Sequence, residues 1–249
     1  MERDEPSSLI MEEGKARLIK IGAEAALFRF EWNGFSIVAK KRIPKSYRHP
    51  TLDFKIRSAR TSHEAKLMHA AKTLGVPCPS IFLVDRSENT LYMEHIDGRQ
   101  LKTIIPEAST DLLRSLGEKV GRHVGLMHGG GIVHGDLTTS NIIMNDKGET
   151  FFVDFGLGDF STEVEERSID VHLMRRALQS SHYSASDSFL SGFEKGYTEV
   201  VGRRVSSEVF QRMEEILSRG RYVKIGKRRP SRTHPKVPPR KPSEGLGAM

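Results

Sequence analysis

The chain has 249 residues, 37% of them hydrophobic, which is enough to bury the core of one large domain or two small lobes and excludes a wholly disordered protein. The single cysteine, Cys78, excludes a disulfide framework and favours a reducing, intracellular compartment. No apolar run approaches the ~18 residues of a membrane-spanning helix, and the polar, acidic start does not resemble a secretory signal. We expect an intracellular protein without membrane contact.

The formal net charge of +7 is unevenly distributed along the chain. Residues 40–60 hold eight lysines and arginines against one acidic residue, and residues 227–249 hold seven against one. The rest of the chain is therefore net acidic. Two basic segments on an acidic body favour a polyanionic or acidic partner, although solvated surface charge explains them equally well.

Short strands dominate the first half of the sequence, and one helix lies among them. The patterns of apolar residues and turns predict strands at 17–20, 26–32, 35–40, 81–85 and 90–96. Apolar residues at helical spacing predict a helix from about Thr61 to Leu74, and Gly75 and Pro77 end it.

The second half is expected to be mainly helical. An amphipathic pattern predicts a long helix that starts near cap candidates at 109–111 and ends at the glycines 129–131. Two short apolar segments around a turn, at 142–144 and 151–153, predict a β-hairpin. Helical periodicity predicts three more helices, at about 166–180, 186–201 and 206–218. Residues 227–249 carry five of the eleven prolines, which predicts a disordered tail.

The strongest functional signal is the sequence HGDLTTSN at 134–141, followed by DFG at 154–156. It resembles the HRDxxxxN and DFG pair of kinases. Because the predicted hairpin lies between them, Asp136, Asn141 and Asp154 are expected to meet at one end of two strands. Asn141 and Asp154 offer hard oxygen ligands for Mg²⁺, and Asp136 can accept a proton from, or orient, an attacking hydroxyl or water. This arrangement is typical of phosphoryl transfer.

A second signal lies upstream, where the strand SIVAK ends in Lys40. It is similar to the kinase strand that carries the phosphate-binding lysine. Lys41 is an adjacent alternative, but neighbouring side chains on a strand face opposite sides, and we select Lys40 because Val38 shares its face. Glu64 on the following helix is the natural ion-pair partner of this lysine. We therefore expect catalytic roles for Asp136, Lys40 and Glu64.

Two further segments are expected to bind ATP. A kinase has a loop of three glycines before its lysine strand, whereas this chain has one glycine there, so the backbone N–H groups at 22–25 can approach phosphates but the turn should be stiffer. The strand LYMEHIDG at 91–98 fits the segment that joins two kinase lobes and contacts adenine. Beside Lys40, the expected nucleotide-binding residues are Gly22, Ala23, Glu24, Ala25, Met93, Glu94 and Ile96.

The motifs IGAEAALF, AKKRIPKSYRHPTLD, LYMEHIDG, HGDLTTSNII, VDFGL and the later RGR together make the resemblance specific. Over roughly residues 17–225 the chain resembles the PRPK (BUD-type) atypical kinases of the KEOPS/EKC complex. The resemblance implies a protein-kinase-like bilobal α+β fold: an N-terminal extension at 1–16, a small β-rich N-lobe at 17–96, a shortened helical C-lobe at 97–226 and a basic tail at 227–249.

The same resemblance implies a role in making threonylcarbamoyladenosine in tRNA. The implied partners are a sugar-kinase-fold tRNA threonylcarbamoyl transferase subunit and a small PRPK-binding protein, with tRNA contact possible through residues 40–60 and 227–249. The implied cofactors are ATP and Mg²⁺, and the implied activity is that of an atypical serine/threonine kinase or ATPase. The implied location is the cytoplasm and nucleus.

Several departures from ordinary protein kinases leave other functions open. Gly135 replaces the arginine of HRD, Thr138 stands where a catalytic-loop lysine is usual, and thirteen residues separate Gly156 from Asp170. Slow, partner-dependent ATP turnover is therefore favoured over rapid phosphorylation of free proteins. The alternatives are an interaction module whose nucleotide site tunes partner binding, and a stand-alone serine/threonine protein kinase.

Overall fold

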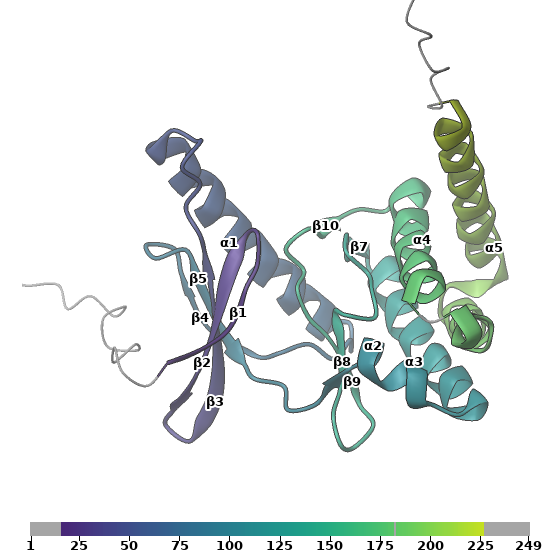
Figure 1. The fold of residues 1–249 in the computed structure, drawn as a ribbon, viewed down its shortest axis with the longest axis horizontal. Coiled ribbons are helices and arrows are strands. Elements are labelled where there is room, and N and C mark those ends of the chain that lie inside the picture. The colour runs from purple at the N-terminus through teal and green to yellow at the C-terminus, as the bar shows by residue number, and fades with distance from the viewer. Residues whose placement is uncertain (1–15, 182, 227–249) are drawn as a thin grey trace, which may run out of the picture.

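The computed structural model describes residues 16–181 and 183–226, and it divides into two lobes (Figure 1). The N-terminal lobe contains an antiparallel sheet and one long helix, and the C-terminal lobe is mainly helical. The expected α+β bilobal architecture is confirmed. The predicted tail at 227–249 and nearly all of the predicted extension at 1–16 lie outside the described residues.

The N-terminal sheet has the strand order β1-β2-β3-β5-β4. Its strands are β1 Arg17–Ile21, β2 Ala25–Trp32, β3 Phe35–Arg42, β4 Ile81–Asp85 and β5 Thr90–Glu94. Strand β3 is central, and its side chains alternate between two cores: Ile37 and Ala39 pack on one face, while Val38 packs on the other, toward helix α1 and the C-terminal lobe. Lys40 therefore points to the side on which the second lobe lies.

Helix α1 runs from Pro50 to Thr73 and begins eleven residues before the predicted start at Thr61. The periodicity of apolar residues missed its first half because Asp53 and Ser58 are the buried residues there, and neither is apolar. Pro50 at the first helical position and Asp53 in the first turn are the start signals that were available. In Figure 1 this first half projects beyond the sheet.

The connection between the lobes and the C-terminal lobe contain short elements around three long helices. In chain order these are β6 Arg99–Gln100, α2 Leu101–Ile104, η1 Ile105–Glu107, α3 Thr110–Gly129, β7 Ile132–Val133, β8 Ile142–Met144, β9 Thr150–Phe152, β10 Asp159–Phe160, α4 Val164–Ser181 and α5 Tyr183–Gly226. The predicted hairpin is present as β8 and β9, which pair antiparallel. Ser109 caps α3 by accepting a hydrogen bond from the Leu112 N–H.

Helix α5 covers the residues of the last two predicted helices, at 186–201 and 206–218. The two predicted helices leave residues 202–205 outside a helix. In the structure the helix is interrupted only at Gly202, whose φ of 81° and ψ of 159° are not helical. Glycine adopts this conformation without a side-chain clash. Helix α5 therefore changes direction at Gly202, and its second part projects from the lobe (Figure 1).

Helices α3 and α5 pack so closely that their backbones touch at glycines. A Cβ atom at Gly117 or Gly121 would lie 2.0 or 2.1 Å from a carbonyl oxygen of α5, and one at Gly192 or Gly196 would lie 2.1 Å from a carbonyl oxygen of α3. Any larger residue at these positions would separate the helices. Because the loop after α3 carries Asp136, this contact gives the candidate site a rigid base.

Within the described ranges, no helix combines the length and apolar character needed to cross a membrane.

Candidate active site

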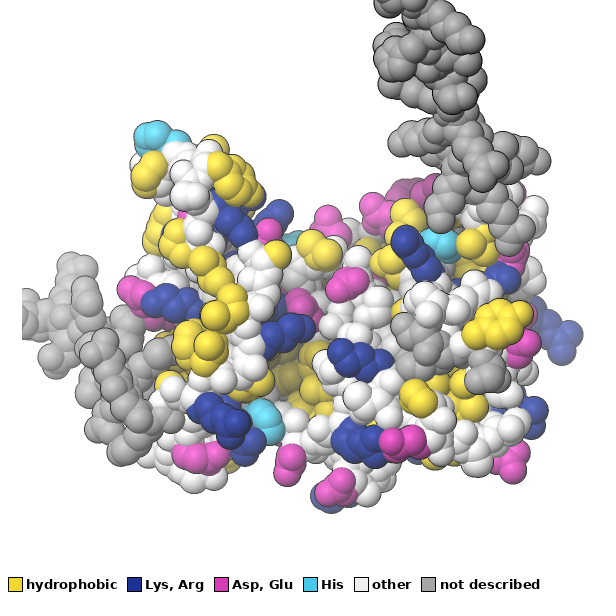
Figure 2. Space-filling view, viewed as in Figure 1, with side chains coloured by type: hydrophobic (Ala, Val, Ile, Leu, Met, Phe, Trp, Pro, Cys, Tyr) yellow, Lys and Arg dark blue, Asp and Glu magenta, His cyan; other side chains and the backbone are white. Residues whose placement is uncertain are grey.

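A cleft between the lobes brings the predicted residues together. Hydrophobic side chains lie deep in the hollow, and charged side chains surround it (Figure 2). One cavity of about 230 Å³ is lined by the turn at 22–25 together with Lys40, Asp136 and Asp154. A second cavity shares Lys40 and Asp154 and is lined by Met93, Glu94, Ile96 and Asn141 among others. The cleft therefore has a charged end and a more apolar end.

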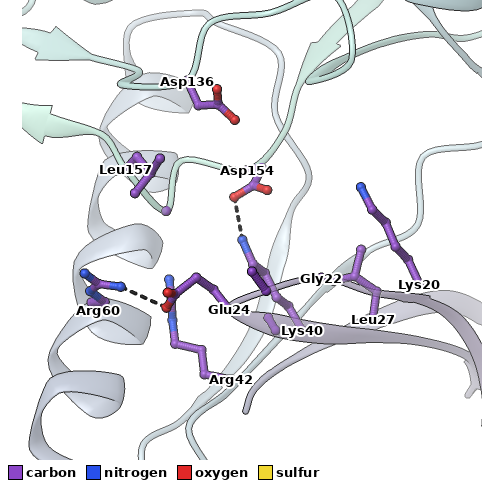
Figure 3. A pocket seen from close by; sticks show the side chains of 13 residues that line it. Lys20, Gly22, Glu24, Leu27, Lys40, Arg42, Arg60, Asp136, Asp154 and Leu157 are labelled. Atoms are coloured by element: carbon purple, nitrogen blue, oxygen red, sulfur yellow. Dashed lines mark hydrogen bonds and ion pairs between the residues drawn. The ribbon is translucent and has the colours of Figure 1, made fainter. Parts of the chain in front are cut away.

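Lys40 lies between the carboxylates of Glu64 and Asp154 at the charged end of the cleft, and its contact with Asp154 is drawn in Figure 3. Its ammonium donates to Glu64 Oε1 at 2.6 Å and to Asp154 Oδ1 at 2.7 Å. Burial opposes the positive charge, but the two carboxylates outweigh this effect and hold the Lys40 pKa above its usual value. Lys41 instead pairs with Glu88 at 2.8 Å on the exposed side of the sheet, so the strand separates the two lysines.

Glu64 is buried on α1 and accepts from two cations. Besides Lys40, the guanidinium of Arg42 donates to Glu64 Oε2 at 2.7 Å, and its side chain is 4% exposed. Sequence analysis missed Arg42 as a site residue. The alternation that selects Lys40 also places Arg42 on the same face of β3, so the signal was present in the strand pattern.

The backbone of Asp154 has a conformation that residues other than glycine rarely adopt. Its φ of 66° lies in the left-handed region, two residues after the end of strand β9. Such backbone conformations cost of the order of 1–3 kcal/mol and cluster at functional sites. Burial would raise the Asp154 pKa, but Lys40 outweighs burial and lowers it, so the carboxylate is ionised at neutral pH.

The loop between β7 and β8 carries Asp136 and Asn141. The Asn141 side-chain amide donates to the Asp136 carboxylate at 2.8 Å and to its backbone carbonyl at 2.9 Å. This leaves the Asn141 side-chain oxygen available as an acceptor. Asn141 also joins the segment before Asp154, because its carbonyl accepts from the Val153 N–H at 3.0 Å. Asp136, Asn141 and Asp154 thus form one constellation.

Buried contacts hold this loop in shape. The carboxylate of Asp170 on α4 accepts from the backbone N–H of His134 at 2.5 Å and of Gly135 at 2.8 Å. The His134 ring lies 3.2 Å from the Val153 carbonyl, and burial lowers its pKa, which keeps it neutral. Sequence analysis assigned no such role to Asp170, because its contact with the His134 N–H spans 36 residues.

Gly135 is required by a close approach of two backbones. It has a φ of 77°, and a Cβ atom there would lie 2.0 Å from the carbonyl oxygen of Leu157. The loop with Asp136 and the segment after Asp154 can therefore pack together only if residue 135 has no side chain.

The turn at 22–25 is closed by a hydrogen bond from the Gly22 N–H to the Ala25 carbonyl at 2.8 Å. It is also attached to helix α1, since Glu24 pairs with Arg60 at 2.9 Å (Figure 3). Lys45 donates to the Ala23 carbonyl as well. These contacts explain how a turn with one glycine keeps its place above the cleft.

Strand β5 ends at Glu94, two residues before the predicted end at Ile96. The backbone N–H of Glu94 donates to Ser80 and that of His95 donates to Ser36. Both N–H groups are therefore used within the protein, and the prediction that main-chain groups of Glu94 to Ile96 contact adenine depends on the other groups of this segment. The N–H of Ile96 is left as the donor that can face a ligand.

Fewer cations of the basic segment 40–60 are available to a partner than the sequence indicates. Six of its eight cations contact carboxylates, namely Lys40, Lys41, Arg42, Arg48, Arg57 and Arg60, and most of those carboxylates lie elsewhere in the chain. The local net charge therefore overstates the positive surface that this segment offers to a partner.

Comparison with known proteins agrees with this geometry. A model of the protein kinase domain matches residues 28–200. The chain is 40% identical over 215 residues to KEOPS complex subunit Bud32 of Pyrococcus abyssi, covering 83% of this chain and 96% of that protein. It is 39% identical over 202 residues to a probable bifunctional tRNA threonylcarbamoyladenosine biosynthesis protein of Methanothermobacter thermautotrophicus, covering 81% of this chain and 36% of that protein.

A protein of the same description from Methanosarcina mazei is 40% identical over 203 residues, with 81% of this chain and 35% of that protein covered. The chain thus spans about a third of the length of these bifunctional relatives, but nearly all of the Pyrococcus protein. It therefore belongs to the protein kinase family and, within it, to the family of KEOPS complex subunit Bud32.

Proposed function

We propose that the chain binds ATP and Mg²⁺ in the cleft and transfers the γ-phosphate to a serine or threonine hydroxyl or to water, as a subunit of a KEOPS-type complex. The observation that carries the proposal is the convergence on one cleft of five residues from four separate segments, namely Lys40, Glu64, Asp136, Asn141 and Asp154. Kinase-family proteins use this set of groups to position ATP and metal.

Each group has a distinct role in the proposed reaction. Lys40 binds the phosphates and Glu64 orients it, while Asn141 and Asp154 hold Mg²⁺ through side-chain oxygens. Bound Mg²⁺ supplies positive charge to the phosphate oxygens. Asp136 orients the attacking hydroxyl or water and accepts its proton. Adenine fits the apolar end of the cleft beside Met93, and the turn at 22–25 covers the phosphates.

Two features support slow turnover. Thr138 brings no positive charge to the catalytic loop, which removes one source of transition-state stabilisation. Only residues 157–163 lie between Gly156 and helix α4, so the chain has little material for a platform that binds peptide substrates. ATP hydrolysis within a complex is thus better supported than rapid phosphorylation of free proteins.

The names of the relatives support a role in tRNA modification. We propose that the chain supports formation of threonylcarbamoyladenosine and binds a sugar-kinase-fold transferase subunit and a small PRPK-binding protein. We further propose the domain limits 1–16, 17–96, 97–226 and 227–249. Because most cations of 40–60 are paired, segment 227–249 is the better candidate for tRNA contact. Segment 227–249 lies outside the described residues. The location of the protein in the cytoplasm and nucleus remains a prediction.

The decisive experiment measures phosphate release from labelled ATP with and without the subunits and tRNA that co-purify with the tagged chain. We expect slow release by the chain alone and faster release in the complex. A second candidate, an interaction module tuned by nucleotide, is favoured by Thr138 and the single-glycine turn. It predicts that nucleotide changes partner affinity with no phosphate release under any condition, and that result would contradict the main proposal.

A further inference from the structure

The structure assigns to Arg42 the role of a positioning residue, which holds Glu64 and helix α1 in the catalytic arrangement whether or not Lys40 contacts Glu64. This inference rests on the proposed function, because it concerns the arrangement needed for phosphoryl transfer. Three observations carry it: the contacts of Glu64, the charges of the cluster and a second attachment of α1.

The two oxygens of Glu64 are shared between two cations. Lys40 donates to Oε1 at 2.6 Å, and Arg42 donates to Oε2 at 2.7 Å. The side chains of Glu64 and Arg42 are almost entirely buried, at 2% and 4% exposed. An arginine cannot lose its proton under these conditions, so its charge remains available to Glu64 throughout the reaction.

The charge of the cluster shows why a second cation matters. Lys40, Arg42, Glu64 and Asp154 sum to zero when all are ionised. When phosphates attract Lys40 and metal attracts Asp154, Glu64 would lose part of its compensation if Lys40 were its sole partner. A buried carboxylate without a partner is strongly unfavourable. Because Arg42 does not contact Asp154 in the structure, it can stay paired with Glu64 and hold it in place while Lys40 changes partners.

A second attachment fixes the first turn of α1 to the end of β3. Asp53 is buried and accepts from Arg57 at 2.7 Å and from the Lys45 N–H at 3.3 Å, and Arg57 also reaches the Arg42 carbonyl at 3.4 Å. Helix α1 is therefore joined to β3 both near its start and in its middle. Helix α1 also contacts the segment after Asp154, because the His63 ring lies 3.3 Å from the Gly158 carbonyl and 3.3 Å from the Asp159 carboxylate, but Arg42 takes no part in these contacts.

Kinetics of one variant and one matched control test the proposal. In Arg42→Met we expect kcat for ATP to fall about tenfold or more, with KM for ATP changed less than about threefold, because an interaction that acts in the transition state is lost. Arg42→Lys should restore part of the rate. Lys41→Met removes a cation from the other face of the same strand and should leave both constants unchanged.

Two kinetic outcomes would overturn the proposal. A raised KM with unchanged kcat would mean that Arg42 binds the nucleotide directly, and a lower melting temperature with unchanged kcat would mean that it is merely structural. The Glu64→Gln background adds a third measurement. There, Arg42→Met should change kcat less than about twofold, since its partner is already lost, whereas a full tenfold effect would show that Arg42 does not act through Glu64.

A distance measurement tests the position of α1 without relying on turnover. Spin labels can be attached at Glu31→Cys on β2 and Lys66→Cys on α1, because Cys78 is buried and its pKa is raised to about 12, so it does not react. We expect a narrow distance distribution without nucleotide, and a broader one after Arg42→Met. An unchanged distribution would overturn the inference. If the parent chain shows no turnover, the proposed function fails while this measurement still decides the role of Arg42.

Discussion

Around helix α1, the N-terminal lobe is held together by buried charges, whereas helices α3 and α5 of the C-terminal lobe meet backbone to backbone. Glu64, Asp53 and their cations attach α1 to β3. Between α3 and α5, glycines allow the two backbones to touch. Ion pairs such as that of Lys195 with Glu118 lie at the more exposed edge of this contact. Charged contacts respond to a charged ligand, but a close-packed backbone contact does not. The comparison therefore separates a ligand-responsive lobe from a rigid one.

The largest expected effect is a loss of phosphate release when Asp154, in the charged cluster at the cleft, is replaced. Replacing Asp154 by Asn removes the negative charge of a metal ligand but keeps a residue that tolerates the left-handed conformation. We expect Mg²⁺-dependent phosphate release to fall to background while the melting temperature changes little. Asp154→Ala should abolish turnover as well, with some added strain. Measurable Mg²⁺-dependent turnover in both variants would show that Asp154 is not a metal ligand.

Substitution of Asp136 tests the second carboxylate of the cleft. Asp136→Ala should lower turnover by ~10²-fold, the usual scale for a positioned proton acceptor, with little change in nucleotide affinity. Single-turnover kinetics and calorimetric titration with a Mg²⁺-nucleotide separate the two quantities. If affinity collapses while the chemical step is unaffected, Asp136 binds nucleotide and does not act on the attacking group.

The glycine contact predicts the reverse pattern, a loss of stability without a specific effect on the chemical step. Gly121→Val should cost about 3 kcal/mol or more, because its side chain meets the Phe193 carbonyl and the helices must separate. Gly129→Ala is the matched control at the end of α3, where a Cβ meets nothing within 4 Å. Denaturant unfolding measures both, and equal stabilities would disprove the close contact.

The smallest expected effect concerns pH. Burial lowers the His134 pKa below its usual 6.5, so the unfolded chain takes up a proton first as the solution is acidified. The stability from neutral His134 is present above pH 6.5 and is lost as pH falls toward the lowered pKa. We therefore expect the free energy of unfolding to decrease as the pH falls from 7 to 5.5. His134→Asn should show a shallower decline, and parallel curves would contradict the assignment.

The sequence predicted those parts of the site that follow from local patterns. Asp136, Asn141 and Asp154 belong to one motif around a hairpin, and strand alternation distinguished Lys40 from Lys41. Alternation applied two residues further would have found Arg42. The role of Asp170 could not be predicted, because it depends on a long-range contact with a loop backbone.

Other features depend on how elements pack. The charge of segment 40–60 was misleading because its partners, such as Glu24 and Glu88, lie far away in sequence. The first half of α1 was missed because its buried side chains are polar. The glycines of α3 follow a helical spacing, but the contact with α5 that requires them is visible only in the structure.

The geometry at Gly135 also limits how this chain could evolve. Many protein kinases carry an arginine at this point of the motif, which can pair with a phosphorylated segment. Here a Cβ atom alone would lie 2.0 Å from the Leu157 carbonyl, and the φ of 77° disfavours any side chain. An arginine could be accepted only after two backbone segments had moved apart. Control by phosphorylation of the segment after Asp154 is therefore closed to this chain through any single substitution at residue 135.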